Sequence, residues 1–256
     1  TVSGDLELLT IEQVIRGPGR VSLHTELRGL ADHPVLDGTA SWDALSAAVA
    51  GLGVVTSPGG RPNLAGNWDE WRGSLSARLA VPKLPAATAA VAVHGARGHM
   101  NIDELRVGGA FGLLTGSGTV ELESGPEFAL DLRARDIDPG AVRPDARGRL
   151  ASRLRLSGRP PDAFDAEISE LEGTLMGRPA AGRVSVSRRG GDWDVRDIDL
   201  SAGPNRLAGT GRFGNRIEGR FRLDAPRLDI IWPALEGSLH GHADIGGTVA
   251  RPVGAI

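Results

Sequence analysis

The segment best suited to bind a nucleotide lies at residues 209–214, which read GTGRFG. Glycines at this spacing match the G-x-G-x-x-G fingerprint, in which a buried strand precedes the glycines and a helix N-terminus then meets a dinucleotide pyrophosphate. Residues 217–223, which follow, instead alternate apolar and charged side chains, as a half-exposed β-strand does. We therefore interpret residues 209–214 as a glycine-rich strand or turn, and we predict no cofactor.

Histidines and an aspartate with metal-ligand spacing occur near the end of the chain. His240, His242 and Asp244 alternate along one face of an expected strand, and their side chains are of types that bind zinc. An internal repeat, however, places Arg153 and Arg155 at the positions equivalent to His242 and Asp244. Because arginine is typical of a face in water, we predict no metal site there.

The other ionisable residues show no catalytic arrangement. His94 and His99 flank a segment with two glycines, which indicates a turn rather than a ligand pair. Asp136 and Asp138 enter an expected turn, where capping of backbone N–H groups is their simplest use. The chain has no cysteine and no G-x-S-x-G nucleophile elbow, which excludes thiolate chemistry, disulfides and a serine hydrolase site of that kind. We predict that the protein is not an enzyme.

Composition narrows the class further. The 256 residues have a formal net charge of −3 with acidic and basic side chains interleaved, so the sequence has no basic patch for nucleic acid. The longest weakly apolar stretch, residues 44–55, is shorter than the about 20 residues of a membrane-spanning helix. Without an initiator methionine or a signal peptide at Thr1, the sequence is expected to be an internal segment of a longer protein.

Alternation of apolar and polar residues dominates the chain, as in residues 128–133 and 217–223. This period of two predicts β-strands with one apolar face and one face in water, and clusters of glycine, proline, aspartate and asparagine between the runs predict turns. Helical signals are limited to residues 41–50, where Ser41 is a candidate N-cap, and to a turn or two within residues 227–235.

The chain also repeats, with an offset of 93 residues. Eight apolar positions between residues 91 and 120 fall on apolar positions of the second copy, and three glycines fall on glycines. The alternation slips phase between Ile102 and Leu105 and again between Val195 and Ile198, which predicts the same β-bulge twice. The offset then drifts to 89 residues. A period of about 90 residues with several strands each favours a stacked, extended β-array.

Strands with one apolar face and almost no helices to cover it leave two arrangements. Two sheets can pack face to face, or one sheet can curl so that its apolar face lines a groove. We predict the second: an all-β fold, an extended, curled, taco-like β-sheet of about 90-residue multi-strand repeats, with an apolar concave groove and very few short helices. One continuous sheet would contain residues 1–90, with a short helix near residues 41–50, the repeat unit 91–183 and its second copy 184–256.

The candidate groove residues are the apolar members of the alternating runs. They are Val91, Val93, Ile102, Val107, Leu114, Val120, Leu122, Phe128, Leu130, Leu132, Leu150, Leu154, Leu156, Val184, Val186, Val195, Leu200, Leu207, Phe213, Phe221, Leu223, Leu239 and Ile245. If this set forms an ordinary sandwich core instead, the protein is a structural spacer.

Loose glycine and alternation motifs resemble those of the TamB family: LTGSGTV at 114–120, LRLSG at 154–158, GTG at 209–211, LDAP at 223–226 and GGT at 246–248. TamB is the inner-membrane-anchored subunit of the translocation and assembly module of Gram-negative bacteria, and it belongs to the AsmA-like, bridge-type lipid transfer proteins. The resemblance covers about residues 25–252. It implies a long periplasmic β-structure whose apolar interior conducts phospholipid between the inner and outer membranes.

The resemblance also implies a role in outer-membrane protein assembly with a barrel partner of the TamA type. That partner, like membrane contact, would involve regions outside this sequence, and nucleic acid is not an expected partner. The alternative to lipid transport is therefore a chaperone that pairs its strand edges with unfolded outer-membrane strands. Transport is the hypothesis that the resemblance favours. The energetics fit it, since exposing a sixteen-carbon chain to water costs about 12 kcal/mol and an apolar groove removes most of that cost.

Overall fold

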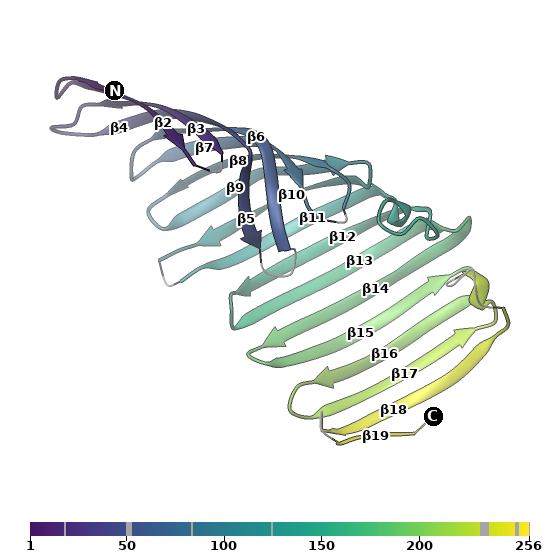
Figure 1. Cartoon of the computed structure of the whole chain (residues 1–256). Helices are drawn as coiled ribbons and strands as arrows, with labels where there is room; N and C mark the ends of the chain where they lie inside the picture. Colours follow the sequence, from purple (N-terminus) through teal and green to yellow (C-terminus); the bar gives the residue numbers. More distant parts are fainter. Residues whose placement is uncertain are drawn as a thin grey trace. The chain divides into compact units, whose positions relative to one another are not determined.

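The computed structural model describes residues 1–255 apart from residues 18, 50–52, 83, 124, 231–235 and 249–250. The chain forms two compact units, residues 1–124 and 125–256. Both are built from antiparallel β-strands (Figure 1), and the described residues include two short 3-10 helices but no α-helix. The expectation of an all-β fold with very few short helices is confirmed.

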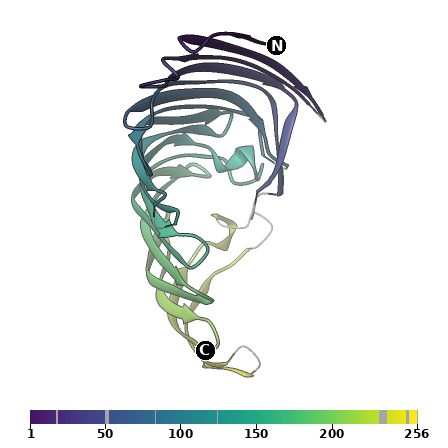
Figure 2. The same ribbon diagram turned by 90° about the vertical axis from the view of Figure 1, so that its left-hand side faces the viewer.

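The first unit is an antiparallel sheet in which each strand pairs with the next, except that β4 and β5 both pair with β6. Its strands are β1 (Val2–Gly4), β2 (Leu8–Arg16), β3 (Arg20–Arg28), β4 (Val35–Asp43), β5 (Leu45–Val49), β6 (Gly53–Gly66), β7 (Trp71–Ala80), β8 (Ala87–Ala96), β9 (His99–Gly109) and β10 (Gly112–Glu121). Figure 2 shows these strands bowed rather than flat. The curl expected from the glycine-rich sequence is therefore present within this unit.

The second unit is also antiparallel, and each strand pairs with the next along the chain. Its elements are β11 (Glu127–Ile137), η1 (Pro139–Ala141), β12 (Gly148–Arg159), β13 (Ala163–Leu175), β14 (Arg178–Arg189), β15 (Asp192–Ala202), β16 (Asn205–Phe213), β17 (Ile217–Ala225), η2 (Leu228–Ile230), β18 (Leu239–Thr248) and β19 (Arg251–Ala255). Residues 160–162, 190–191 and 214–216 turn the chain along one border of this sheet, where the strands end. We call the two borders formed by strand ends the edges of this unit's faces. The 3-10 helices lie at the opposite edge, after β11 and β17 (Figure 1).

Strand register divides the side chains of each unit between two faces, because residues that lie opposite each other point to the same side. Leu130 lies opposite Leu156, and Leu156 lies opposite Ala166. The next row pairs Asp131 with Arg155. We call the side with Leu130 the apolar face and the side with Asp131 the polar face, and we use the same terms for the first unit.

The repeated bulge predicted from the phase slip is confirmed. In β9, Asp103 has no partner on β8, and in β15, Arg196 is skipped in the same way by β14. The two skipped residues are 93 positions apart, as the repeat requires, and each bulge returns the following apolar side chains to the apolar face. The two 3-10 helices also correspond, since η1 and η2 begin 89 positions apart.

The expectation of a short helix near residues 41–50 is wrong. β4 continues to Asp43, Ala44 adopts a left-handed backbone conformation with φ of 59°, and β5 then runs from Leu45 to Val49. All of β5 pairs with β6. Pairing with a neighbouring strand therefore overrides the helix preference of this alanine-rich segment. Residue 50 lies outside the described residues.

The turn expected within residues 227–235 is confirmed as far as the structure describes it. η2 occupies Leu228–Ile230, and residues 231–235 lie outside the described residues. The compact units meet at residues 124 and 125. The division into residues 1–90, 91–183 and 184–256 stays a prediction about the sequence copies.

Candidate functional site

The apolar face of the second unit brings together residues that are far apart in the sequence. One register row crosses eight strands through Leu132, Leu154, Ile168, Val184, Ile198, Gly209, Phe221 and Ala243. A row of the first unit runs through Pro62, Leu75, Val91, Leu105 and Gly116. Neither row contains a charged side chain, so each unit presents an apolar stripe that crosses its strands.

The predicted groove residues lie on these faces with one exception. The first unit's apolar face holds Val91, Val93, Ile102, Val107, Leu114 and Val120. The second unit's apolar face holds Phe128, Leu130, Leu132, Leu150, Leu154, Leu156, Val184, Val186, Val195, Leu200, Leu207, Phe213, Phe221, Leu223, Leu239 and Ile245. Leu122 follows the end of β10 with its side chain 55% exposed, and its backbone N–H donates to the Gly98 carbonyl oxygen at 2.7 Å.

Sequence reasoning missed the contribution of β13. Phe164 and Ile168 lie on the apolar face, and so do Leu171 and Leu175 beyond a bulge. Glu170 in this bulge has a left-handed φ of 54°, which interrupts the alternation that signals a strand. A phase slip interpreted as a bulge, as in β9 and β15, would have identified this strand.

Much of the first unit's apolar face was also missed. It adds Leu9, Ile11, Val21, Leu23, Leu27, Leu36, Leu64, Trp71 and Leu75. The signal was present in residues 20–28, RVSLHTELR, where apolar residues occupy alternate positions except at Thr25. Each unit therefore has its own apolar face.

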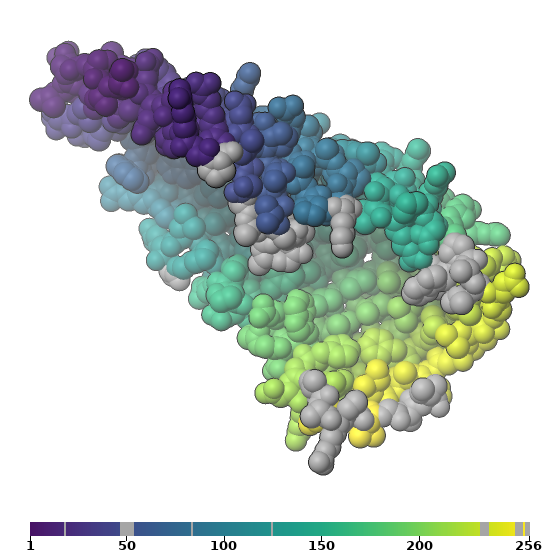
Figure 3. Space-filling view, in the orientation of Figure 1, coloured from purple at the N-terminus to yellow at the C-terminus, as the bar shows by residue number. Residues whose placement is uncertain are grey.

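Among the described residues of each unit, the side chains of the apolar face are not covered by a second layer. In the described part of the chain the buried apolar residues are Ala77, Leu132, Ala134, Ala180, Ala225 and Ile230, and no large side chain is fully buried. Leu64, Trp193 and Leu239 remain 44%, 43% and 51% exposed. In a closed two-sheet core such residues would be buried. Figure 3 shows the hollowed surface of the second unit between its two edges.

Two aromatic rings on the apolar faces, those of Phe221 and Trp42, lie against glycines. A Cβ atom at Gly209 would be 2.4 Å from Cδ1 of Phe221, and one at Gly60 would be 2.2 Å from Cζ2 of Trp42. The Trp42 indole Nε1 also donates to Ser57 Oγ at 2.9 Å, which fixes the ring in place. Glycine at these positions therefore keeps the apolar surface smooth.

Hollows occur on both faces, and their chemistry differs. A hollow of about 350 Å³ on the first unit's apolar face is lined mainly by Leu27, Pro34, Leu36, Leu64, Trp68 and Trp71. Larger hollows of about 750 and 710 Å³ are lined mainly by polar-face side chains, including Arg220 and Asp244 in one and Glu12 and His24 in the other. Hydrocarbon in the larger hollows would strip water from charged groups, so they suit solvent and not an acyl chain.

One edge of the second unit's apolar face is covered by its own chain. Asn205, on the apolar face and 2% exposed, donates from Nδ2 to the Arg227 carbonyl oxygen at 2.6 Å, and its Oδ1 accepts from the Arg227 N–H at 3.1 Å. Ile230 of η2 is 5% exposed. These contacts tie the η2 segment to the apolar face at the edge opposite residues 190–191.

The capping expected of Asp138 is confirmed. Its Oδ1 accepts hydrogen bonds from the N–H groups of Gly148 and Gly140, both at 2.9 Å. These bonds hold the pKa of the Asp138 carboxyl below its usual range, because they stabilise the charged form. Asp136 instead lies in a bulge with a φ of 53° and forms an ion pair with Arg149 at 3.4 Å.

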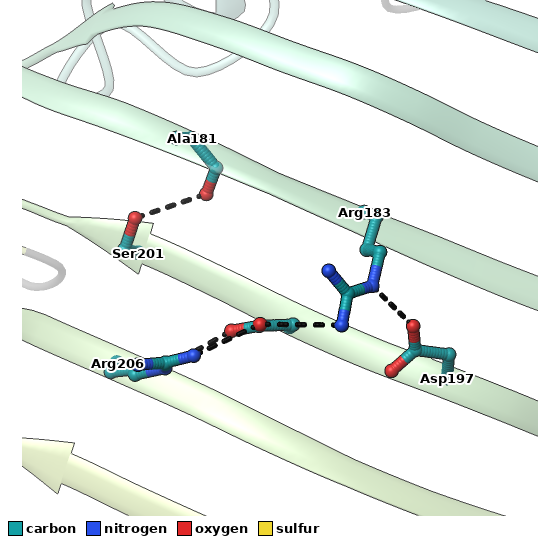
Figure 4. A network of polar contacts seen from close by, with 6 residues as sticks. Ala181, Arg183, Asp197, Ser201 and Arg206 are labelled. Atoms are coloured by element: carbon teal, nitrogen blue, oxygen red, sulfur yellow. Dashed lines mark hydrogen bonds and ion pairs between the residues drawn. The ribbon is translucent and has the colours of Figure 1, made fainter.

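The polar face is a network of arginine–carboxylate pairs. Arg206 donates from Nε and Nη2 to both oxygens of Asp199, each at 3.0 Å, and Arg183 bridges Asp197 and Asp199 (Figure 4). The hydrogen bond from Arg206 is the main cause that lowers the pKa of Asp199. Exposed pairs of this kind each contribute little to stability, but together they make this face a solvent-exposed surface with balanced charge.

The residues with metal-ligand spacing lie on the polar face. His240 Nδ1 is 2.7 Å from Asp224 Oδ1, and Asp244 pairs with Arg220 at 3.5 Å. Among the described residues no group of three or more histidine or carboxylate side chains is arranged to hold a metal ion. Residues 209–213 of the nucleotide-like motif lie within β16 and are followed by β17, so their interpretation as a glycine-rich strand is confirmed.

His94 and His99 flank the turn between β8 and β9, as predicted. His94 Nδ1 is 2.8 Å from Asp103, and His99 Nδ1 contacts Glu121. The hydrogen bond with Glu121 raises the pKa of His99, with a smaller contribution from Asn101. Both rings thus serve as partners of carboxylates on the polar face.

Comparison with known families assigns the chain. Among the described residues the helices are η1 and η2, and neither has the length or apolarity of a membrane span. The family described as TamB, N-terminal domain, matches residues 1–255, whereas no solved structure gives a significant match. That family has a role in envelope assembly and lipid transport and is of a non-enzymatic bridging or assembly type. On this match and on its repeated all-β sheet, the chain belongs to the TamB family.

Proposed function

We propose that the apolar face carries the acyl chains of phospholipids between the inner and outer membranes of a Gram-negative envelope, with the chain in the periplasm. The observation that supports this function is the half-exposure of the apolar face. In the part of each unit that the structure describes, its large side chains have no second layer to pack against. Apolar area left open to water is costly, so the face suits an apolar occupant that is not part of the chain.

The chemistry of the face suits transport better than tight storage. Contacts between hydrocarbon and Leu, Val, Ile and Phe are non-directional, so an acyl chain that slides along the register rows, from one strand to the next, loses no specific bond. Each acyl methylene that is kept out of water lowers the free energy by about 0.8 kcal/mol. This gain holds the acyl chain on the apolar face as it moves. The rings of Phe221 and Trp42 are held against glycines and so do not project across this path.

Replacing Phe221 with glutamate tests the proposal. Phe221 lies on the apolar face of β17, and its neighbour Arg222 lies on the polar face, opposite His242. Phospholipid is loaded onto the protein from mixed micelles, and the retained lipid is extracted and quantified by chromatography. Phe221→Glu is expected to lose most retained phospholipid and keep its β-sheet circular dichroism, whereas the control Arg222→Glu is expected to keep both.

Two results would contradict lipid transport. Retention of phospholipid by Phe221→Glu at the level of the unmodified chain would exclude the apolar face as the binding surface. Complete unfolding of Phe221→Glu, with Arg222→Glu folded, would indicate a closed core, since a buried unpaired charge is strongly destabilising.

A second candidate function, strand-edge pairing with outer-membrane proteins, is favoured by the β5–β6 ribbon. The register pairs β5 with β6, Leu45 and Val54 are 37% and 53% exposed, and no charged residue occurs in residues 44–60. Natural sheet edges are usually protected by charges, so an uncharged edge suits an added strand. In this second candidate function, a barrel protein of the TamA type would be the partner in outer-membrane protein assembly. Loss of binding to an outer-membrane β-strand peptide in Leu45→Lys, with lipid retention unchanged, would support it.

A further inference from the structure

Aromatic side chains of the second unit gather in one register row of the apolar face. This aromatic row crosses β11 to β17 in the order Phe128, Gly158, Phe164, Arg188, Trp193, Phe213 and Ile217. Each member is the first, second, last or second-last residue of its strand, at the edge turned by residues 160–162, 190–191 and 214–216. The rings of Phe128 and Phe164 lie 6.4 Å apart across Gly158.

Arg188 is the charged member of this row. Its side chain is half-buried, and the guanidinium carbon lies 5.8 Å from the centroid of the Trp193 ring. Within the described residues this guanidinium has no carboxylate partner. Its neighbour Arg189, on the polar face, pairs with Asp165 at 2.6 Å. A cation on an apolar surface without an anion beside it is costly, so an anion from outside the chain would stabilise it.

The two edges of the apolar face differ in what they offer such an anion. At the opposite edge, η2 covers the surface, and Arg178 there acts electrostatically on Asp229 of η2. At the edge of the aromatic row, hairpins of two or three residues turn the chain and Trp193 stays 43% exposed. The aromatic row therefore lies where the apolar face meets water.

We propose that the aromatic row marks the level of phospholipid head groups in the second unit, with the phosphodiester bound by Arg188 and the acyl chains extending towards the η2 edge. This inference rests on the proposed function and adds an orientation and a head-group chemistry to it. Aromatic side chains favour the zone between hydrocarbon and water, where one end of the ring system is apolar and the other is wet. Arginine binds phosphate oxygens with a planar fork of donors, and the Trp193 ring orients that fork.

Quenching by spin-labelled lipid tests the orientation. The chain has no cysteine, so single cysteines can be labelled with a fluorophore at Ile217 in the aromatic row, at Leu239 near the η2 edge, and at Arg222 on the polar face as a control. The probes are phosphatidylcholine with a nitroxide on its head group and the same lipid with a nitroxide near the end of its acyl chain. Head-group nitroxide is expected to quench position 217 more than position 239, and acyl nitroxide the reverse.

The outcomes separate this inference from the proposed function. Equal or reversed quenching at positions 217 and 239 overturns the orientation and leaves lipid binding intact. Quenching at neither position beyond that of the polar-face control overturns lipid binding itself, and the inference with it.

Binding of the phosphodiester by Arg188 is tested separately, by comparing the retention of lipids with and without phosphate. The unmodified chain is expected to retain phosphatidylglycerol about tenfold better than diacylglycerol, which has the same chains without phosphate. Arg188→Gln is expected to lose this preference while it keeps diacylglycerol binding, and Arg222→Gln is expected to keep it. An unchanged preference in Arg188→Gln overturns the assignment. So does displacement of phosphatidylglycerol by an excess of inorganic phosphate, since Arg188 would then bind a free anion.

Discussion

Replacing Gly209 with alanine tests whether the ring of Phe221 lies against the sheet. A Cβ atom at this position would be 2.4 Å from Cδ1 of Phe221 and 2.6 Å from the Arg220 carbonyl oxygen, both far inside van der Waals contact. The ring and β17 would have to move, and overpacking of this kind costs about 1–3 kcal/mol. Alanine also lowers the entropy of the unfolded chain, which returns about 0.4–1 kcal/mol. The expected net loss of stability is about 1–2 kcal/mol.

Gly241 offers a matched control for this substitution. It lies on the apolar face of β18, on the other side of β17, and a Cβ atom there would have nothing within 4 Å. Gly241→Ala is therefore expected to be neutral or more stable by up to about 1 kcal/mol. Urea unfolding of both variants, followed by circular dichroism, gives the comparison. Equal urea midpoints for Gly209→Ala and Gly241→Ala would refute the reasoning, because they would show that the ring does not occupy the space above Gly209.

Three further predictions concern the polar face, the η2 segment and the β5 edge. The hydrogen bond from Arg153 lowers the pKa of Asp131, so this pair stabilises the fold above the unfolded pKa of about 4 and loses its effect as the pH falls through the folded pKa. The urea midpoints of Asp131→Asn and the unmodified chain should differ at pH 7 and converge in acid. Asn205→Ala leaves both backbone groups of Arg227 without this partner, which should destabilise the closed position of η2 by about 1–3 kcal/mol, measured as faster hydrogen exchange in residues 227–230. An uncharged edge strand favours pairing between copies of the chain, so we expect self-association through β5. Leu45→Lys places a charge there and should reduce self-association in sedimentation velocity, and unchanged association would contradict a role for that edge.

The faces of individual strands could be predicted from sequence because side chains of a strand alternate with a period of two residues. The same regularity made the bulges at Asp103 and Arg196 visible as a shared phase slip. Alternation did not reveal β13, because the bulge at Glu170 interrupts it. Residues 45–49 were wrongly predicted as helical, because their alanine content reflects only a local preference. Their pairing with β6 is a contact that no local preference records.

Alternation and the repeat were enough, without coordinates, to indicate an all-β chain with one apolar and one charged side, since both depend on neighbours along the strand. Only the tertiary structure showed three features: the openness of the apolar side, the rings held over glycines and the aromatic row around Arg188. Phe128, Phe164, Trp193 and Phe213 are separated by 20 to 36 positions, so no sequence window contains them together. Strand register aligns them, and register is set by hydrogen bonds between strands that a linear pattern does not encode.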